Sequence, residues 1–135
     1  MHITGQCHCG FVTYEAEVDP ERVSICHCQD CQMLTGSAYR VTATASAQSF
    51  RLTSGIPKVY IKSGDSGRRS AQYFCPDCGS PVYRTAADEA TQEVGIRLGT
   101  INQRRKLSPK RQIWCRSALP WAKNLRDLPA IDGDD

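Results

Sequence analysis

The chain has 135 residues and a formal net charge of +3, with 40% apolar and 23% charged residues. This balance excludes an intrinsically disordered chain, and the length fits one domain. No apolar run approaches the ~18 residues of a membrane-spanning helix, and the first residues lack a basic segment followed by an apolar one, so we expect a cytoplasmic protein without a membrane partner. We expect one zinc-binding domain over 1–127 and a loose acidic tail over 128–135.

Short strand-like segments separated by turn signals follow one another along most of the chain, which is typical of antiparallel β structure. Helix is expected in only two places, over 29–35, where Gly36 ends it, and near 86–92. We therefore predict a mainly β fold with few short helical turns. The predicted strands, in chain order, cover 11–16, 39–45, 50–52, 58–62, 70–74, 81–84, 94–101 and 112–115.

The eight cysteines carry the strongest chemical signal in the sequence. In a reducing cytoplasm, closely spaced cysteines indicate metal ligands more than disulfides. Two cysteines separated by one or two residues can reach one zinc ion from a tight turn, so each pair supplies half of a tetrahedral site. The cysteines form two pairs, one cluster of three and one single residue: Cys7 with Cys9, Cys75 with Cys78, Cys26 with Cys28 and Cys31, and Cys115.

The spacing divides seven of these cysteines between two zinc ions. The cluster within six residues can offer three thiolates to one ion and leave its fourth position open, which is typical of catalytic zinc; this three-cysteine group is Cys26, Cys28 and Cys31. The two pairs complete a closed, structural site only together, and this four-cysteine group is Cys7, Cys9, Cys75 and Cys78. We therefore predict two zinc ions per chain.

Two alternatives compete with this assignment. Cys75 and Cys78 have the spacing of a redox pair, but the sequence after them predicts a strand, whereas a thioredoxin-like pair begins a helix. The three-cysteine group is a second structural site if His8, His27 or Cys115 provides a fourth ligand. His27 alternates with two cysteines and should point away from their metal, and we expect Cys115 to be buried in an apolar strand.

The basic residues of the chain allow a different class of function. The basic stretch 104–111 supports a non-catalytic zinc module that binds protein or nucleic acid, although no aromatic stacking pattern accompanies it, so nucleic acid is the weaker expectation. An open three-thiolate zinc site that binds a further thiolate carries net negative charge. Arg40, Arg68 and Arg69 are candidates to balance that charge or to bind a substrate carboxylate.

Several stretches together resemble the glutathione-dependent formaldehyde-activating enzyme family, whose domain is shared with centromere protein V. The resemblance spans nearly the whole chain, in order and in spacing. It rests on Gly5-Gln6-Cys7-His8-Cys9-Gly10, Cys26-His27-Cys28-Gln29-Asp30-Cys31, Thr35-Gly36-Ser37-Ala38-Tyr39, Phe74-Cys75-Pro76-Asp77-Cys78-Gly79-Ser80-Pro81, Ile113-Trp114 and Ser117-Ala118-Leu119-Pro120-Trp121.

The resemblance implies twisted antiparallel sheets of the β-tent type, a structural zinc on the four-cysteine group and an active-site zinc on the three-cysteine group. It also implies a carbon–sulfur lyase that joins glutathione and formaldehyde. On this basis we expect a small thiol to be held as a thiolate and to attack an aldehyde carbon. Gln112 stands where many members carry a histidine, and an amide cannot transfer a proton by titration.

Overall fold

The computed structural model describes residues 1–88, 90 and 92–134. Its described residues form strands and one α-helix, α1 (Gln29–Thr35), which confirms the predicted mainly β fold. None of the described helices is long and apolar enough to cross a membrane. The strands are β1 (His2–Gln6), β2 (Thr13–Cys26), β3 (Arg40–Ser46), β4 (Arg51–Ser54), β5 (Lys58–Ser63), β6 (Arg69–Phe74), β7 (Pro81–Ala86), β8 (Glu93–Arg97) and β9 (Arg111–Ile113).

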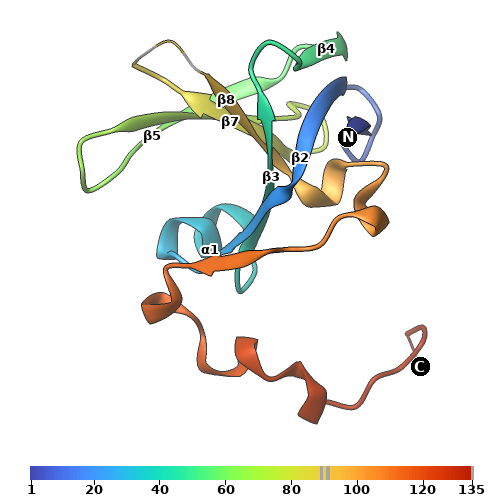
Figure 1. The fold of residues 1–135 in the computed structure, drawn as a ribbon, viewed down its shortest axis with the longest axis vertical. Helices are drawn as coiled ribbons and strands as arrows, with labels where there is room; N and C mark the ends of the chain where they lie inside the picture. The colour runs from blue at the N-terminus through green and yellow to red at the C-terminus, as the bar shows by residue number, and fades with distance from the viewer. Residues whose placement is uncertain (89, 91, 135) are drawn as a thin grey trace.

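The long strand β2 joins two parts of the sheet (Figure 1). Its first half pairs with β1 and β4, and its second half pairs with β3 and β9. The register on β3 shifts between Val18 and Val23, which lets the strand twist from one part into the other. From β3 the sheet continues through β8, β7 and β6 to β5. All of these pairs are antiparallel except that between β2 and β9.

The core lies where the two parts of the sheet face each other. Ile3 on β1, Val23 on β2, Val82 on β7 and Ile96 on β8 are fully buried there. A chain of four aromatic rings crosses the same region, with centroids 5.5, 4.5 and 4.4 Å apart: Tyr14, Phe50, Tyr83 and Tyr73. Alternation along β1 and the first half of β2 supplies part of this interior, whereas the last four residues of β8 are all buried.

Helix α1 begins and ends where the sequence predicts. Cys28 is its N-cap, and Gly36 ends it in the left-handed conformation with φ 62°. Nζ of Lys62 on β5 lies 3.0 Å from Oδ2 of Asp30 in the first turn. This ion pair holds the helix beside the far edge of the sheet.

The structure departs from the predicted elements at four places. The strand expected over 11–16 continues to Cys26, because the register shift accommodates Pro20. The strand expected over 94–101 ends at Arg97, where a 3-10 turn follows. The first strand, β1, was not predicted. The short helix near 86–92 was wrong in the described part: β7 ends at Ala86, 87 and 88 form a bend, and 89 and 91 lie outside the described residues.

The end of the chain differs as well. The strand expected over 112–115 ends at Ile113, because Trp114 takes a left-handed backbone with φ 57° and turns the chain. Cys115 therefore lies in a 3-10 turn and is exposed, which corrects the expectation of a buried cysteine. Figure 1 shows the chain after this turn leading away from the sheet. The side chains of 128–134 are exposed.

Candidate metal centres

Two tight turns bring the four-cysteine group together. Cys7 and Cys9 follow β1, and Cys75 and Cys78 lie between β6 and β7. Both turns end on a glycine with positive φ, 83° at residue 10 and 78° at residue 79, which frees the backbone to turn. Two segments that are far apart in the sequence therefore form one group of four sulfurs, each of which lies within 4.8 Å of the others.

The sulfur distances fit a tetrahedral metal. Sγ of Cys9 lies 3.7 Å from Sγ of Cys7 and 3.7 Å from Sγ of Cys75. Four ligands about 2.3 Å from one zinc ion stand about 3.8 Å apart, whereas a disulfide needs about 2.05 Å. Backbone N–H groups point at two of the sulfurs, from Val12 to Cys7 at 3.3 Å and from Asp77 to Cys75 at 3.4 Å. Such donors stabilise thiolates, so the donor set suits zinc.

Ser80 connects the two turns of the four-cysteine group. Its hydroxyl accepts a hydrogen bond from the backbone N–H of His8 at 3.0 Å and lies 3.2 Å from Sγ of Cys78. The stretch 74–81 that carries the family resemblance contains this serine, but the sequence gave it no role in the site. It fixes the relative position of the two half-sites without being a ligand.

The three-cysteine group lies where β2 passes into α1. Cys26 is the last residue of β2, Cys28 caps the helix and Cys31 lies in its first turn. The ligand sulfurs lie within 4.8 Å of one another, and the N–H of Cys31 donates to Sγ of Cys28 at 3.3 Å. One local turn thus presents three sulfurs to a single ion, as the spacing predicts.

The environment of these thiols differs from one to the next. The hydrogen bond from the Cys31 thiol, helped by the backbone N–H of Cys28 and the positive charge of Arg40, lowers the pKa of Cys26 to about 5. The same hydrogen bond and burial raise the pKa of Cys31. The group therefore holds at least one thiolate at neutral pH, which favours metal binding.

No fourth protein ligand completes the three-cysteine group within the described residues. The alternatives raised by the sequence are placed elsewhere. His8 is exposed beside the other group, and Cys115 is exposed in its own turn. His27 is buried, and its Nε2 lies 2.7 Å from Oε1 of Gln112. The arrangement can therefore hold a metal with one position left for another molecule.

Of the three arginines that the sequence singled out, the fold brings one to this group. Arg40 lies opposite Cys26 in the β2–β3 register, so both side chains are on the same face. Burial lowers the pKa of Arg40, and the negative charge of the nearby cysteines partly offsets this lowering. Nη1 of Arg69 instead pairs with Oδ1 of Asp88 at 3.0 Å. Arg68 lies in the turn before β6 and is exposed.

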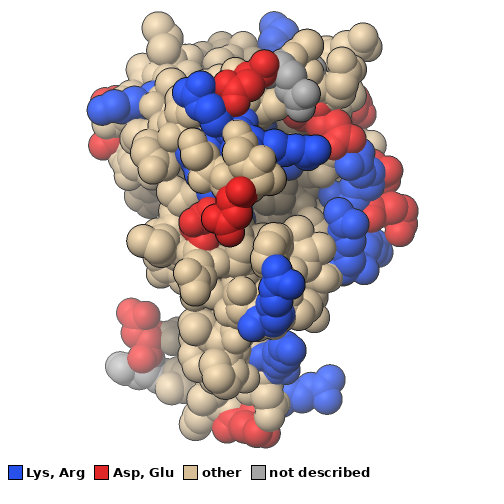
Figure 2. All heavy atoms as spheres, turned by 90° about the vertical axis from the view of Figure 1, so that its left-hand side faces the viewer, with Lys and Arg blue, Asp and Glu red and all other residues tan. Residues whose placement is uncertain are grey.

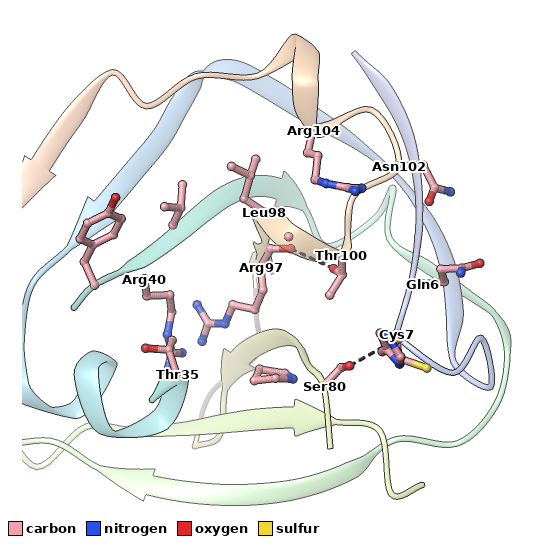
Figure 3. Close-up of a pocket in the computed structure, with 15 residues that line it drawn as sticks. Gln6, Cys7, Thr35, Arg40, Ser80, Arg97, Leu98, Thr100, Asn102 and Arg104 are labelled. Atoms are coloured by element: carbon pink, nitrogen blue, oxygen red, sulfur yellow. Dashed lines mark hydrogen bonds between the residues drawn. The ribbon is translucent and has the colours of Figure 1, made fainter. Parts of the chain in front are cut away.

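A cavity of about 690 Å³ extends between the two groups (Figure 3). Cys7 and Ser80 lie at one end of it and Arg40 and Thr35 at the other, with Arg97 between them. Sequence patterns gave no sign of Arg97, which ends β8 directly after three buried residues and is itself buried. The cavity offers room for a small molecule next to Arg40, which in turn lies beside the three-cysteine group; those three cysteines do not line the cavity themselves.

The basic stretch 104–111 does not form a recognition element. Arg104 begins a 3-10 turn and donates from Nη1 to the carbonyl of Ile101 at 3.1 Å, while Arg111 begins β9. Figure 2 shows Lys and Arg interspersed with Asp and Glu on the face that it presents. That face carries charge of both signs and so no extended positive field, while the 3-10 turn of 104–106 lies on the other side of the molecule.

The comparisons with known proteins agree with this architecture. A family model described as "Glutathione-dependent formaldehyde-activating enzyme" matches residues 2–117, which include both cysteine groups. Among solved structures, a crystal structure of a Rhodobacter sphaeroides protein is 21% identical and has a TM-score of 0.62, covering 81% of this chain and 98% of that chain. That likeness supports the fold alone. No curated protein matches this chain.

Proposed function

Because this chain belongs to the glutathione-dependent formaldehyde-activating enzyme family, we propose that it joins a small thiol to an aldehyde at the three-cysteine group. The observation that carries this proposal is a set of three sulfurs within 4.8 Å of one another, without a fourth ligand in the described part of the chain. Glutathione and formaldehyde are the reactants that the family name suggests. The reaction would class the protein as a carbon–sulfur lyase.

The two cysteine groups take different roles in this proposal. The four-cysteine group holds a structural zinc, since its sulfurs leave no position for a reactant. The three-cysteine group holds the second zinc, which when bound supplies the charge that keeps a reacting thiol deprotonated. We place the protein in the cytoplasm, where the thiols that both zinc sites need stay reduced.

The addition itself conserves all atoms of both reactants. The thiol sulfur forms a bond to the carbonyl carbon, the π electron pair of the carbonyl moves to its oxygen, and that oxygen takes up the proton that the thiol released. No group is oxidised or reduced. Arg40 lies beside the sulfurs and stabilises the added negative charge, and it also lines the cavity from which a reactant would approach.

Gln112 has a role in this arrangement that does not require proton transfer. Its Oε1 accepts from Nε2 of His27, a fully buried ring between two of the proposed ligands. The amide thus orients the loop that carries the sulfurs. This positioning is compatible with the replacement of the histidine that many family members carry.

Exchange NMR of a glutathione and formaldehyde mixture tests the proposal, because it measures the rate of adduct formation directly. The zinc-loaded protein should accelerate the exchange. Cys28→Ser should abolish the acceleration, and Cys115→Ser, a change at an exposed cysteine outside both groups, should keep it. No acceleration by the zinc-loaded protein, for glutathione or for other small thiols, would contradict the enzyme and favour a non-catalytic zinc module that binds protein or nucleic acid.

A further inference from the structure

Two buried arginines meet beside the three-cysteine group. Arg40 is 4% exposed and Arg97 is 8% exposed. Both donate to one acceptor, Oε1 of Gln72, from Nη1 of Arg40 at 3.0 Å and from Nη2 of Arg97 at 2.7 Å. Arg97 also donates from Nη1 to the hydroxyl of Thr42 at 2.8 Å. Two like charges therefore share a neutral amide in the interior.

Arg40 keeps one edge of its guanidinium without a partner. Its Nε and Nη2 atoms are buried and make no hydrogen bond. In the described residues no carboxylate lies within ion-pair distance of Arg40 or Arg97. Buried charged donors without partners are costly, so this edge indicates a group that the protein itself does not supply.

The unpartnered atoms have the geometry of a carboxylate receptor. Nε–H and Nη2–H lie on the same side of the planar guanidinium and point in parallel, which is the fork that binds the two oxygens of a carboxylate. Figure 3 shows the guanidinium groups of Arg40 and Arg97 close to each other in the cavity. Both residues also line a second cavity of about 390 Å³. Arg40 and Arg97 therefore border two cavities, and a small shift of a side chain would open the buried fork to a molecule held there.

The charges near the fork leave room for one anion. Three thiolates and a divalent ion carry one net negative charge, which offsets one of the two guanidinium charges. Burial, with the charges of Arg40 and Arg84, lowers the pKa of Arg97 to about 9, so Arg84 adds to the positive charge here. The guanidinium charge that the zinc site does not offset has no carboxylate counterion among the described residues. A single monocarboxylate would supply it.

We propose that Arg40 and Arg97 form a carboxylate-binding site for a reactant of the three-cysteine group. The assignment rests on the proposed function only for the identity of the reactant. An oxo acid aldehyde carries its carboxylate on the carbonyl carbon, and Arg40 lies directly opposite the proposed ligand Cys26. A thiol such as glutathione also has a carboxylate, but that carboxylate lies farther from the reacting sulfur than the carboxylate of an oxo acid lies from its carbonyl carbon.

Binding is measured first, without turnover. ¹⁹F NMR of difluoroacetate with the zinc-loaded protein should show line broadening that acetate reverses, and trifluoroethanol, which is uncharged, should show none. Arg40→Lys keeps the charge but not the fork and should weaken binding by about tenfold or more. Arg105→Lys, at an exposed arginine, is the matched control and should bind as the wild type does. No broadening with wild type, or equal broadening with Arg40→Lys, would overturn the site.

Arg97→Lys provides a second variant in case Arg40→Lys loses zinc or does not fold. It removes the other guanidinium at a residue farther along the sheet, on β8, and should also weaken difluoroacetate binding. Measurements of zinc content and circular dichroism show which variants are folded and zinc-loaded, and only those variants are compared with wild type. If both folded variants bind difluoroacetate as tightly as wild type, the arginine pair does not bind carboxylates.

Kinetics then identify which reactant carries the carboxylate. Glyoxylate and formaldehyde are each paired with glutathione and with 2-mercaptoethanol, which has no carboxylate. A rise in KM in Arg40→Lys confined to glyoxylate assigns the site to the aldehyde, and one confined to glutathione assigns it to the thiol. An equal rise in all four pairs would overturn the carboxylate site and leave charge balance as the role of Arg40. Absence of turnover by wild type would contradict the proposed function but not a positive ¹⁹F result.

Discussion

Nε2 of the buried His27 lies 2.7 Å from Oε1 of Gln112. Because an amide oxygen only accepts hydrogen bonds, the imidazole donates through Nε2, and this bond ties the loop of the three-cysteine group to β9. The backbone N–H of His27 reinforces the connection, since it donates to the carbonyl of Ile113 at 3.1 Å. A parallel strand from the far end of the chain therefore supports the candidate metal centre.

Gln112→Leu should destabilise the protein by about 1–3 kcal/mol, because the buried Nε2–H of His27 would lose its acceptor. Urea denaturation measures the free energy of unfolding. Gln48→Leu, at an exposed glutamine, is the matched control and should change stability little. Equal stability of the two variants would show that the hydrogen bond to His27 does not support the loop.

Gly5→Ala should destabilise the fold by about 1–3 kcal/mol through overpacking. A Cβ at this position would overlap the hydroxyl of Tyr14 and lie 2.6 Å from the carbonyl oxygen of Thr100. Gly99→Ala is the control, since a Cβ there meets nothing within 4 Å. Thermal unfolding should separate the two variants, and a melting temperature for Gly5→Ala at or above that of Gly99→Ala would contradict the close packing of β1 on Tyr14.

Cys26 should be the first thiol of the three-cysteine group to react when the metal is removed. Hydrogen bonding from Cys31 lowers its pKa to about 5, so it is a thiolate at pH 6, where a free cysteine peptide is almost entirely protonated. Its rate of alkylation should fall only below pH 5. The pKa of Cys31 is raised by the same hydrogen bond, so this residue should react late. Mass spectrometry after timed iodoacetamide labelling gives both rates, and a Cys26 rate that rises only near pH 8 would refute the interaction.

Cys75→Ser and Cys28→Ser should differ in their effect on stability. Cys75 is fully buried and belongs to the group that joins the turn after β1 to the β6–β7 turn, so its loss should cost more than about 4 kcal/mol. Cys28 is half-buried at the N-cap of a short helix, and because serine is itself a good N-cap, Cys28→Ser should cost at most about 1 kcal/mol. Denaturation of both variants in zinc-containing buffer tests the division of roles. A greater loss from Cys28→Ser would reverse it.

Local chemistry made most of the fold and both cysteine groups predictable. A run of β-branched and aromatic residues marks the strand at 58–62, and Gly36 marks the end of α1. The cysteine spacings restrict which sulfurs can reach one ion, and the structure brings together the same two groups.

Long-range pairing was not predictable in the same way. The length of β2 depends on a register shift around Pro20 that only its partners define. The end of β9 depends on the left-handed backbone of Trp114, a conformation that this residue type rarely adopts. Arg40, Gln72 and Arg97 lie on three strands that are far apart in the sequence. No sequence motif therefore predicts that both arginines donate to the same glutamine.

The zinc content of the reduced protein and of Cys28→Ser tests the central claim most directly, because each group should hold its own ion. Elemental analysis should find two zinc ions in the wild type and one in Cys28→Ser, with the fold retained. One ion in both proteins would contradict a metal centre at the three-cysteine group, and with it the proposed chemistry.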